Sequence, residues 1–253
     1  MKVISCYLGG NKTEVYEAPL DADCFFFSNN KDLERLAQKS GWNFIFVEDM
    51  PISAEPRVAS LQSKFIKFLQ FKKSLINWTP SESILYFDHK FAVKSEHIGL
   101  IQNLCSSEIL IRNTPKEKLS IQDEINAALP QKRYVEVMPE TVQWINAKIT
   151  KEKLSPNNRI MNTGLILYAD VEKSQKLCDE VYEACWLLGQ PECQIIWGLI
   201  SQPYEGLITR IDWNDLDILW KEKSPIDLIS SESNQRWALI KRFLKNNDKL
   251  KVQ

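Results

Sequence analysis

Short apolar runs alternate along this chain with longer segments whose apolar residues recur at helical spacing. The apolar runs predict β-strands at residues 3–8, 24–27, 43–47, 84–87, 109–111 and 161–168. The helical spacing predicts α-helices at residues 32–39, 57–76, 95–104 and 171–188, and one more that begins near residue 192. This alternation favours an α/β fold with a mostly parallel, doubly wound sheet, in which ligands bind outside the carboxyl ends of the strands.

Three segments depart from this alternation. Residues 116–153 have the pattern of a mainly helical insert, residues 207–220 are irregular or β, and the segment from about residue 231 onward has the pattern of a basic helix. The sequence contains no internal repeat and no low-complexity linker. We therefore expect one domain over residues 1–253, with a core at about 1–205 and a C-terminal extension at about 206–253.

Composition and charge narrow the classes of function. The 253 residues are 44% hydrophobic and 26% charged, which is typical of a globular domain, and a net charge of −1 predicts no nucleic-acid partner. The six cysteines contain no CxxC pair and only two histidines accompany them, which disfavours a zinc site. The first residues do not form a secretory signal and no run is long enough to span a membrane, so we expect a cytoplasmic protein.

The first candidate for chemistry is the end of the apolar run ILYF, where the chain continues with Asp88, His89 and Lys90. A carboxylate at the end of a buried strand is well placed to meet a ligand, directly or through a metal-bound diphosphate. Lys90 stands where a second carboxylate would complete an Asp-x-Asp metal site, and its ammonium group would instead meet phosphate directly. The alternative is that Asp88 only caps the next turn.

The second candidate is the basic face of the helix predicted over residues 57–76. Lys64 and Lys67 are three residues apart and therefore neighbours on one face, with Arg57 two turns earlier. Such a face suits a diphosphate. An ordinary solvated face is the alternative.

Two further segments carry polar residues at places that suit a sugar. Asn162 and Gly164 open the strand predicted over residues 161–168, where a bare backbone would allow a ligand to approach closely. Glu192 and Gln194 lie at the start of a predicted helix. The alternatives are a turn residue at Asn162 and a helix-capping charge at Glu192.

The order of these segments resembles the GT-A glycosyltransferases. More narrowly, it is similar to a glycosyltransferase-like family of bacterial polysaccharide loci and plant Golgi proteins that was formerly a domain of unknown function. The similarity runs from about residue 3 to 202. The segments that carry it are YLGGNK, FFFSNN, GWNFIFVED, PRVASLQSKFIKFL, ILYFDHKFAV, IRNTPKEKLSIQDEI, MNTGLILY and ECQIIW.

The resemblance implies a GT-A-like, Rossmann-like fold and transfer of a sugar from a nucleotide-sugar donor to a saccharide or lipid-linked acceptor, in surface polysaccharide synthesis. It places Asn29 beside the donor, and it suggests Asp123, Glu124 and Glu192 as catalytic carboxylates. An inverting reaction would need such a base, whereas a retaining reaction can proceed without one. The alternative is a non-catalytic relative that binds a nucleotide or a glycan.

The sequence departs from the family at several positions. Asn29 and Asn30 lie near a place that is usually acidic, Lys67 stands where the family often has His, and Cys193 stands where an Asp precedes Gln. The resemblance implies Mn²⁺ or Mg²⁺ held by Asp88. The single carboxylate followed by Lys90 instead favours weak metal dependence.

The predicted C-terminal helix is amphipathic. Trp237, Ile240 and Leu244 fall on one stripe, and basic residues fill the rest of its surface. Such a helix either packs its stripe on the domain or lies on the anionic surface of the inner membrane, where a lipid-linked acceptor would be found.

Overall fold

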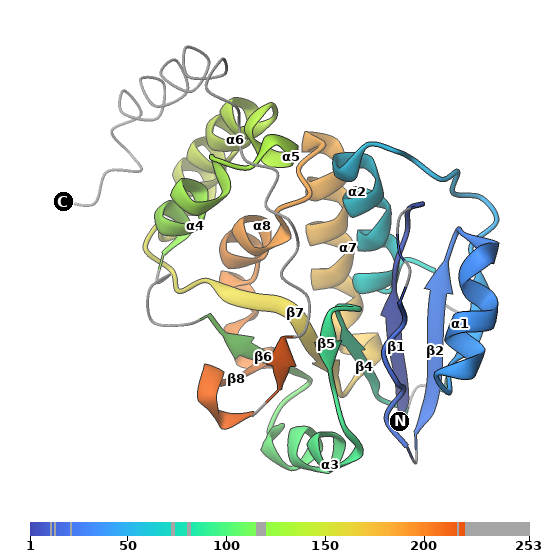
Figure 1. Ribbon diagram of the computed structural model, residues 1–253. Helices are drawn as coiled ribbons and strands as arrows, with labels where there is room; N and C mark the ends of the chain where they lie inside the picture. The colour runs from blue at the N-terminus through green and yellow to red at the C-terminus, as the bar shows by residue number, and fades with distance from the viewer. Residues whose placement is uncertain are drawn as a thin grey trace.

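A computed structural model describes residues 1–10, 12, 14–20, 22–71, 74–79, 82–114, 120–216 and 218–220. Seven strands form one mixed sheet of order β3-β2-β1-β4-β7-β6-β8, drawn through the middle of the molecule in Figure 1. In sheet order they are β3 (Asn43–Phe46), β2 (Asp23–Ser28), β1 (Lys2–Cys6), β4 (Ile84–Phe87), β7 (Met161–Tyr168), β6 (Ile109–Asn113) and β8 (Ile208–Ile211). Strand β7 is antiparallel to both of its neighbours, and the other pairs are parallel.

Helices cover both faces of this sheet. One face packs against α2 (Pro56–Lys67), α7 (Val171–Leu188) and α8 (Cys193–Ile200), and the other against α1 (Glu34–Lys39) and α3 (Ser95–Leu104). A short second sheet pairs β5 (Phe91–Ala92) with β9 (Leu219–Trp220). The 3-10 helices are η1 (Lys31–Leu33), η2 (Gln202–Leu207) and η3 (Trp213–Asp215).

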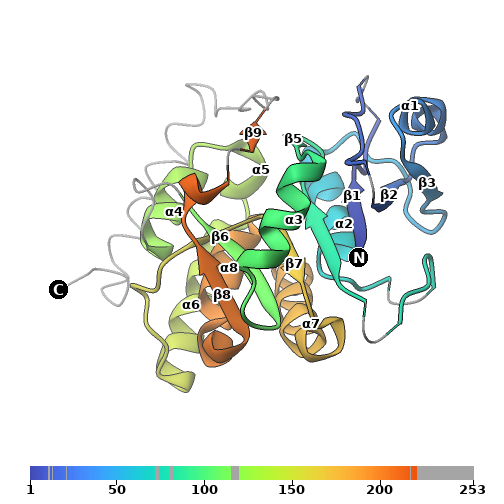
Figure 2. The same cartoon turned by 90° about the horizontal axis from the view of Figure 1, so that it is seen from below.

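The helical insert forms a third packing unit. Its helices are α4 (Ile121–Ala128), α5 (Lys132–Val135) and α6 (Met138–Glu152). Their apolar residues pack with one side of α8 rather than with the sheet. Figures 1 and 2 show the insert and α1 at opposite ends of the sheet.

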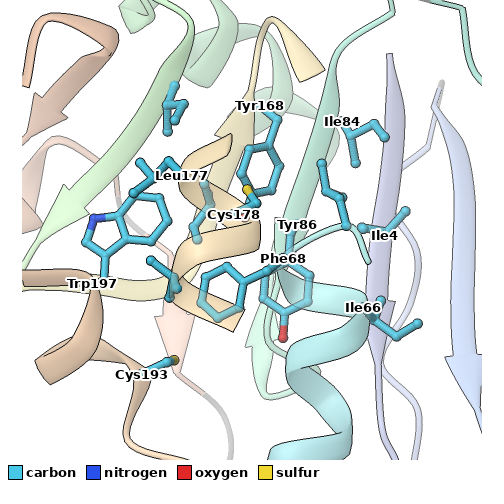
Figure 3. Packing of buried hydrophobic residues seen from close by; sticks show 14 of the residues in the cluster. Ile4, Ile66, Phe68, Ile84, Tyr86, Tyr168, Leu177, Cys178, Cys193 and Trp197 are labelled. Carbon is cyan, nitrogen blue, oxygen red and sulfur yellow. The ribbon is translucent and has the colours of Figure 1, made fainter. Parts of the chain in front are cut away.

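Strand β4 shows how the sheet builds two cores at once. Ile84 and Tyr86 face the α2–α7–α8 side, whereas Leu85 and Phe87 face the α1–α3 side, as the two-residue period of a strand requires. All four side chains are buried, and each contributes about 1.5–3 kcal/mol by leaving water. Figure 3 shows Tyr86 beside Phe68, with its hydroxyl oxygen pointing away from Tyr168.

The predicted α/β class, the mostly parallel sheet flanked by helices and the helical insert are confirmed. Residues 84–87, 95–104, 161–168 and 171–188 form the elements that the sequence predicts, with the same ends. The predicted helix at the C-terminus lies outside the described residues, as do residues 221–253 as a whole. The boundary between a core and an extension near residue 205 stays a prediction.

The helix predicted over residues 57–76 is too long, because α2 ends at Lys67. Leu69 has a φ of 55°, and its N–H bonds to the Ile66 carbonyl while the N–H of Gln70 bonds to the Phe65 carbonyl. This is the hydrogen-bond pattern of a Schellman motif, here closed by leucine rather than glycine. The left-handed conformation costs about 1–2 kcal/mol, which is offset because Leu69 is completely buried.

The first strand is also shorter than predicted. It ends at Cys6, and the chain then turns through Gly9, whose φ of 149° favours glycine. The Gly9 N–H donates to Asn29 Oδ1 over 3.0 Å. Because β1 is parallel to β2 and to β4, the carboxyl ends of these three strands lie at one edge of the sheet, beside this turn.

Candidate functional site

The site is centred on Asp88, which follows β4 directly. Lys67, the last residue of α2, places its Nζ 3.1 Å from Asp88 Oδ1. The Tyr86 hydroxyl donates to the same oxygen over 2.7 Å, and the Lys67 ammonium lies 5.2 Å from the centre of the Tyr86 ring. The end of a strand and the end of a helix thus fix one carboxylate from two sides.

The charges of this cluster stabilise one another. Burial alone would raise the pKa of Asp88, but the positive charges of Lys67 and Lys90 and the hydrogen bond from Tyr86 hold it well below its usual value. Burial opposes the charge of Lys67, but Asp88 raises the pKa of Lys67 above its usual value. Burial and the Asp88 charge raise the pKa of the Tyr86 hydroxyl. Both members of the ion pair therefore stay charged at neutral pH.

Two more lysines add positive charge beside this pair. The side chain of Lys64 is buried one turn before Lys67, and its charge also acts on Asp88. Burial lowers the pKa of Lys90, and Asp88 and Glu192 partly offset this effect. The structure therefore brings the predicted residues Lys64, Lys67 and Lys90 around Asp88. Arg57, which is half-buried, lies in the first turn of α2.

Gly164 allows the strand β7 to pass close to this carboxylate. A Cβ atom at Gly164 would lie 2.6 Å from Phe91 Cε2, 2.8 Å from Asn162 Oδ1 and 3.1 Å from Asp88 Oδ2. The Asp88 N–H donates to the Gly164 carbonyl over 2.8 Å, and Asn162 Oδ1 accepts from the Gly164 N–H. The bare backbone here makes room for the chain's own side chains, and Asn162 is brought to the edge of the Asp88 site.

Two of the three predicted catalytic carboxylates meet at the start of α8. The Gln194 side-chain amide donates to Glu124 Oε1 and to Glu192 Oε1, each over 3.2 Å. Both glutamates are buried. Asp123 is not part of this group: it is exposed and closes the capping box of α4 through Ser120. Asp123 and Glu124 are adjacent on α4, so their side chains point in different directions.

The remaining predicted residues lie at the ends of β1, β2 and β4. Asn29 is buried, and its amide donates to the Pro51 carbonyl as well as accepting from Gly9. It therefore organises the two loops that border the strand ends. The half-buried His89 ring stands edge-on to the Tyr7 ring, 5.0 Å between centroids.

Sequence reasoning missed Tyr86, Thr163 and the place of Cys193. The Cys193 Sγ lies 3.1 Å from Thr163 Oγ1 and 3.9 Å from Lys67 Nζ, so it joins the cluster from the first turn of α8. In the sequence, Tyr86 belongs to the apolar run ILYF, which predicts a buried strand. Its position two residues before Asp88 puts both on the same face of the strand path, which is a signal that the sequence does contain.

Among the residues that the structure describes, the donor atoms around Asp88 do not fit a divalent cation. Within the described ranges, no group of three His, Cys, Asp or Glu side chains gathers as a metal site. The one carboxylate at the strand end is already held by the Lys67 ammonium at 3.1 Å. A cation would have to displace a positive charge there, and the described residues form no group of three possible metal ligands that includes Asp88.

Comparison with models of known protein families finds no match, and no curated protein matches the chain. Among solved structures, the apo form of mouse xyloside xylosyltransferase 1 is similar with 11% identity and a TM-score of 0.44, over 84% of this chain and 86% of that chain. The galactosyltransferase LgtC in complex with donor and acceptor sugar analogues has 10% identity and a TM-score of 0.43, over 100% and 97%. An active-site mutant of LgtC has 12% identity and a TM-score of 0.41, over 83% and 72%.

A membrane-spanning helix is not found among the residues that the structure describes.

Proposed function

We propose that this protein is a GT-A-type glycosyltransferase that moves a sugar from a nucleotide-sugar donor to a saccharide or lipid-linked acceptor, in surface polysaccharide synthesis. One observation carries the proposal: Lys64, Lys67 and Lys90 surround a fixed carboxylate, Asp88, at the carboxyl edge of an α/β sheet. That edge is where such sheets bind ligands. Three ammonium groups against one carboxylate leave an excess of positive charge, which suits a diphosphate.

The lysines would act on the leaving group. When the bond between the sugar and the diphosphate breaks, negative charge grows on the phosphate oxygens. Fixed positive charges stabilise that state at no cost of reorganisation. Lys90, two residues after Asp88, would contact the diphosphate, and Lys67 would hold Asp88 in place through their ion pair. Asp88 would orient the sugar hydroxyls with its second oxygen, Oδ2.

Glu192 and Glu124 would serve the acceptor. They share one amide donor, Gln194, so the carboxylate pair is positioned as a unit. A carboxylate that removes the proton from the acceptor hydroxyl would support an inverting reaction. A retaining reaction would use the same pair only to hold the acceptor. Asp123 takes no part in this mechanism, because its carboxylate caps α4.

The reaction would then depend weakly on metal ions, since Lys90 takes the place of the cation. The test is donor turnover after treatment with EDTA. Activity should be largely kept, and activity that EDTA abolishes and Mn²⁺ restores would contradict this part of the proposal.

A non-catalytic relative that binds a nucleotide or glycan is the second candidate. It is favoured by the same ion pair, because the Asp88 oxygen Oδ1 is occupied by Lys67 and Tyr86. Slow hydrolysis of a donor sugar, or its transfer to an acceptor, would separate an enzyme from a binding protein.

The decisive experiment compares nucleoside diphosphates with nucleosides in a thermal-shift screen, because a ligand that binds only the native state raises its stability. Lys64→Ala should weaken binding of the diphosphates about tenfold and leave the nucleosides unchanged. Lys148→Ala is the matched control, since Lys148 pairs with Glu152 on the insert, away from the Asp88 cluster. Equal loss for both ligand classes would refute the proposed phosphate site.

Peripheral contact with the inner membrane through residues 231–253 remains part of the proposal. Truncation of this segment should abolish binding to anionic vesicles and leave the protein folded. Lower stability of the truncated protein would instead show that the helix packs on the domain.

A further inference from the structure

A second buried charge lies at the carboxyl end of β6, apart from the Asp88 cluster. The side chain of Arg112 is 0% exposed. Its Cζ lies 3.7 Å from the centre of the Trp213 ring and 5.4 Å from that of the Phe91 ring. The register of β6 shifts between Ile111 and Arg112, which re-aims the side chain at the end of the strand. Two aromatic rings therefore hold the planar guanidinium in place.

The hydrogen-bonding edge of this guanidinium has no partner from the protein. In the described part of the chain, Arg112 Nε and Nη2 are buried and neither donates a hydrogen bond. Burial lowers the pKa of Arg112 to about 10, and no charged group among the described residues contributes to that shift. Nε and Nη2 form one edge of the guanidinium, and this edge matches the two oxygens of a carboxylate.

Such an arrangement is unfavourable in the protein alone. A buried cation that lacks a counter-charge loses its hydration without compensation, and an apolar side chain of similar volume would avoid that loss. The stacked rings recover only part of it. The missing counter-charge and hydrogen-bond acceptors therefore point to a ligand that brings both.

The position of Arg112 links it to the proposed sugar site. Arg112 pairs in register with Asn162, the residue beside Gly164 and Asp88. Phe91 touches both places, because its ring abuts Gly164 and also lies against Arg112. The neighbouring Asn113 donates to Asp212, while its buried Oδ1 accepts no hydrogen bond from the described residues. Two donors and one acceptor thus lie side by side, as a hydroxy acid requires.

We propose that Arg112 binds the carboxylate of an acidic sugar, of the uronic acid class, at the sugar end of the Asp88 site. This rests on the proposed function and names its substrate class. Trp213, half-exposed on the three-residue helix η3, covers the guanidinium and would turn aside to admit the sugar. Asn113 Oδ1 would accept from a hydroxyl of the same sugar.

The first test measures the binding of free D-glucuronate, D-glucose and inorganic phosphate to the full chain by ligand-observed NMR titration. The wild type should bind glucuronate at least about tenfold more tightly than glucose, the effect of one charge-assisted pair of hydrogen bonds. Arg112→Met should abolish this preference and Arg112→Lys should reduce it. Arg210→Met is the control, because Arg210 is only partly buried and pairs with Glu205.

Two results of that titration would overturn the proposal. One is a wild type without preference for glucuronate, or a preference that survives Arg112→Met. The other is inorganic phosphate that displaces glucuronate at equal concentration, which would make the site a phosphate site.

The second test is the stability of the ligand-free protein. If Arg112 awaits a ligand, Arg112→Met should raise Tm by about 2 °C or more, because it removes an uncompensated buried charge. A lower Tm would show that Arg112 is a structural residue and would refute the proposal. Binding of nucleoside diphosphates, measured separately with Lys64→Ala, reports on the proposed function alone, so the two failures are distinguishable.

Discussion

The ends of β4 and β6 bury charge in opposite ways. The two strands run in the same direction, because each is antiparallel to β7, and their carboxyl ends lie at one edge of the sheet. At β4, Lys67 finds a carboxylate at 3.1 Å and a tyrosine hydroxyl completes the group. At β6, Arg112 finds two aromatic rings and no counter-charge among the described residues.

This difference separates what a protein needs to fold from what it needs to bind. A compensated cluster holds its geometry without help, and its surplus charge is then directed at the ligand. An uncompensated charge lowers stability until a ligand arrives, which is the usual exchange of stability for function at binding sites.

The largest effect is expected where the compensated pair is broken. Lys67→Met leaves Asp88 without its closest cation and should lower the free energy of unfolding by about 3–5 kcal/mol, measured by urea denaturation. Asp88→Asn in the same chain should recover a large part of this loss, because no unpaired charge then remains. Strictly additive losses in the double variant would show that the two residues do not act as a pair.

Gly164→Ala should affect both the Asp88 cluster at the end of β4 and the Arg112 site at the end of β6. The added Cβ would lie 2.6 Å from Phe91 and 3.1 Å from Asp88, so the ring that stacks on Arg112 and the carboxylate must both shift. Overpacking of this kind costs about 1–3 kcal/mol. Gly99→Ala is the control, because a Cβ there meets nothing within 4 Å. Equal stability of the two variants would contradict the close packing at Gly164.

Tyr86→Phe removes one hydrogen bond from the compensated cluster. Its hydroxyl donates to a charged oxygen, so its loss should cost about 1.5–3 kcal/mol. The matched control is Tyr168→Phe, whose hydroxyl donates over 2.8 Å to the neutral Lys67 carbonyl and should cost about 1 kcal/mol. If both variants lose the same free energy of unfolding in urea denaturation, the hydrogen bond from Tyr86 to Asp88 is no stronger than a bond to a neutral carbonyl.

Much of this fold could be predicted from the sequence, because its elements follow the apolar pattern. The run ILYF places two side chains on each face of the sheet, and α7 begins after Asp170, whose side chain accepts from the Lys173 N–H. The end of α2 could not be predicted, since a leucine replaces the glycine that usually marks such a motif. The reversal of β7 leaves no local signal, because strand direction depends on the path of the chain through the insert.

The candidate site was predictable in its positions and less so in its contacts. Asp88 and the lysines follow from strand ends and helix spacing, and the structure brings them together. The separation of Asp123 from Glu124 depends on a capping box, which the pattern Ser120-x-x-Asp123 does contain. The sequence around Arg112 does not indicate a binding site, because a single arginine in the strand IRN is ordinary. Its role depends on the Trp213 ring, which lies far away in the sequence and covers it in the structure.

The smallest effect is expected in the pH dependence of the compensated pair. The folded-state pKa of Asp88 lies below its ordinary value of 3.8, and that of Lys67 lies above 10.5. A depressed carboxyl pKa gives stability that is complete above the unfolded pKa and is lost as the pH falls through the folded one. The stability difference between the wild type and Asp88→Asn, measured by urea denaturation, should therefore stay constant from pH 5 to 9 and shrink only below about pH 4. A difference that already shrinks between pH 7 and 5 would show that Asp88 titrates near neutrality. Asp88 would then not be the permanently charged partner of Lys67 that distinguishes the end of β4 from the end of β6.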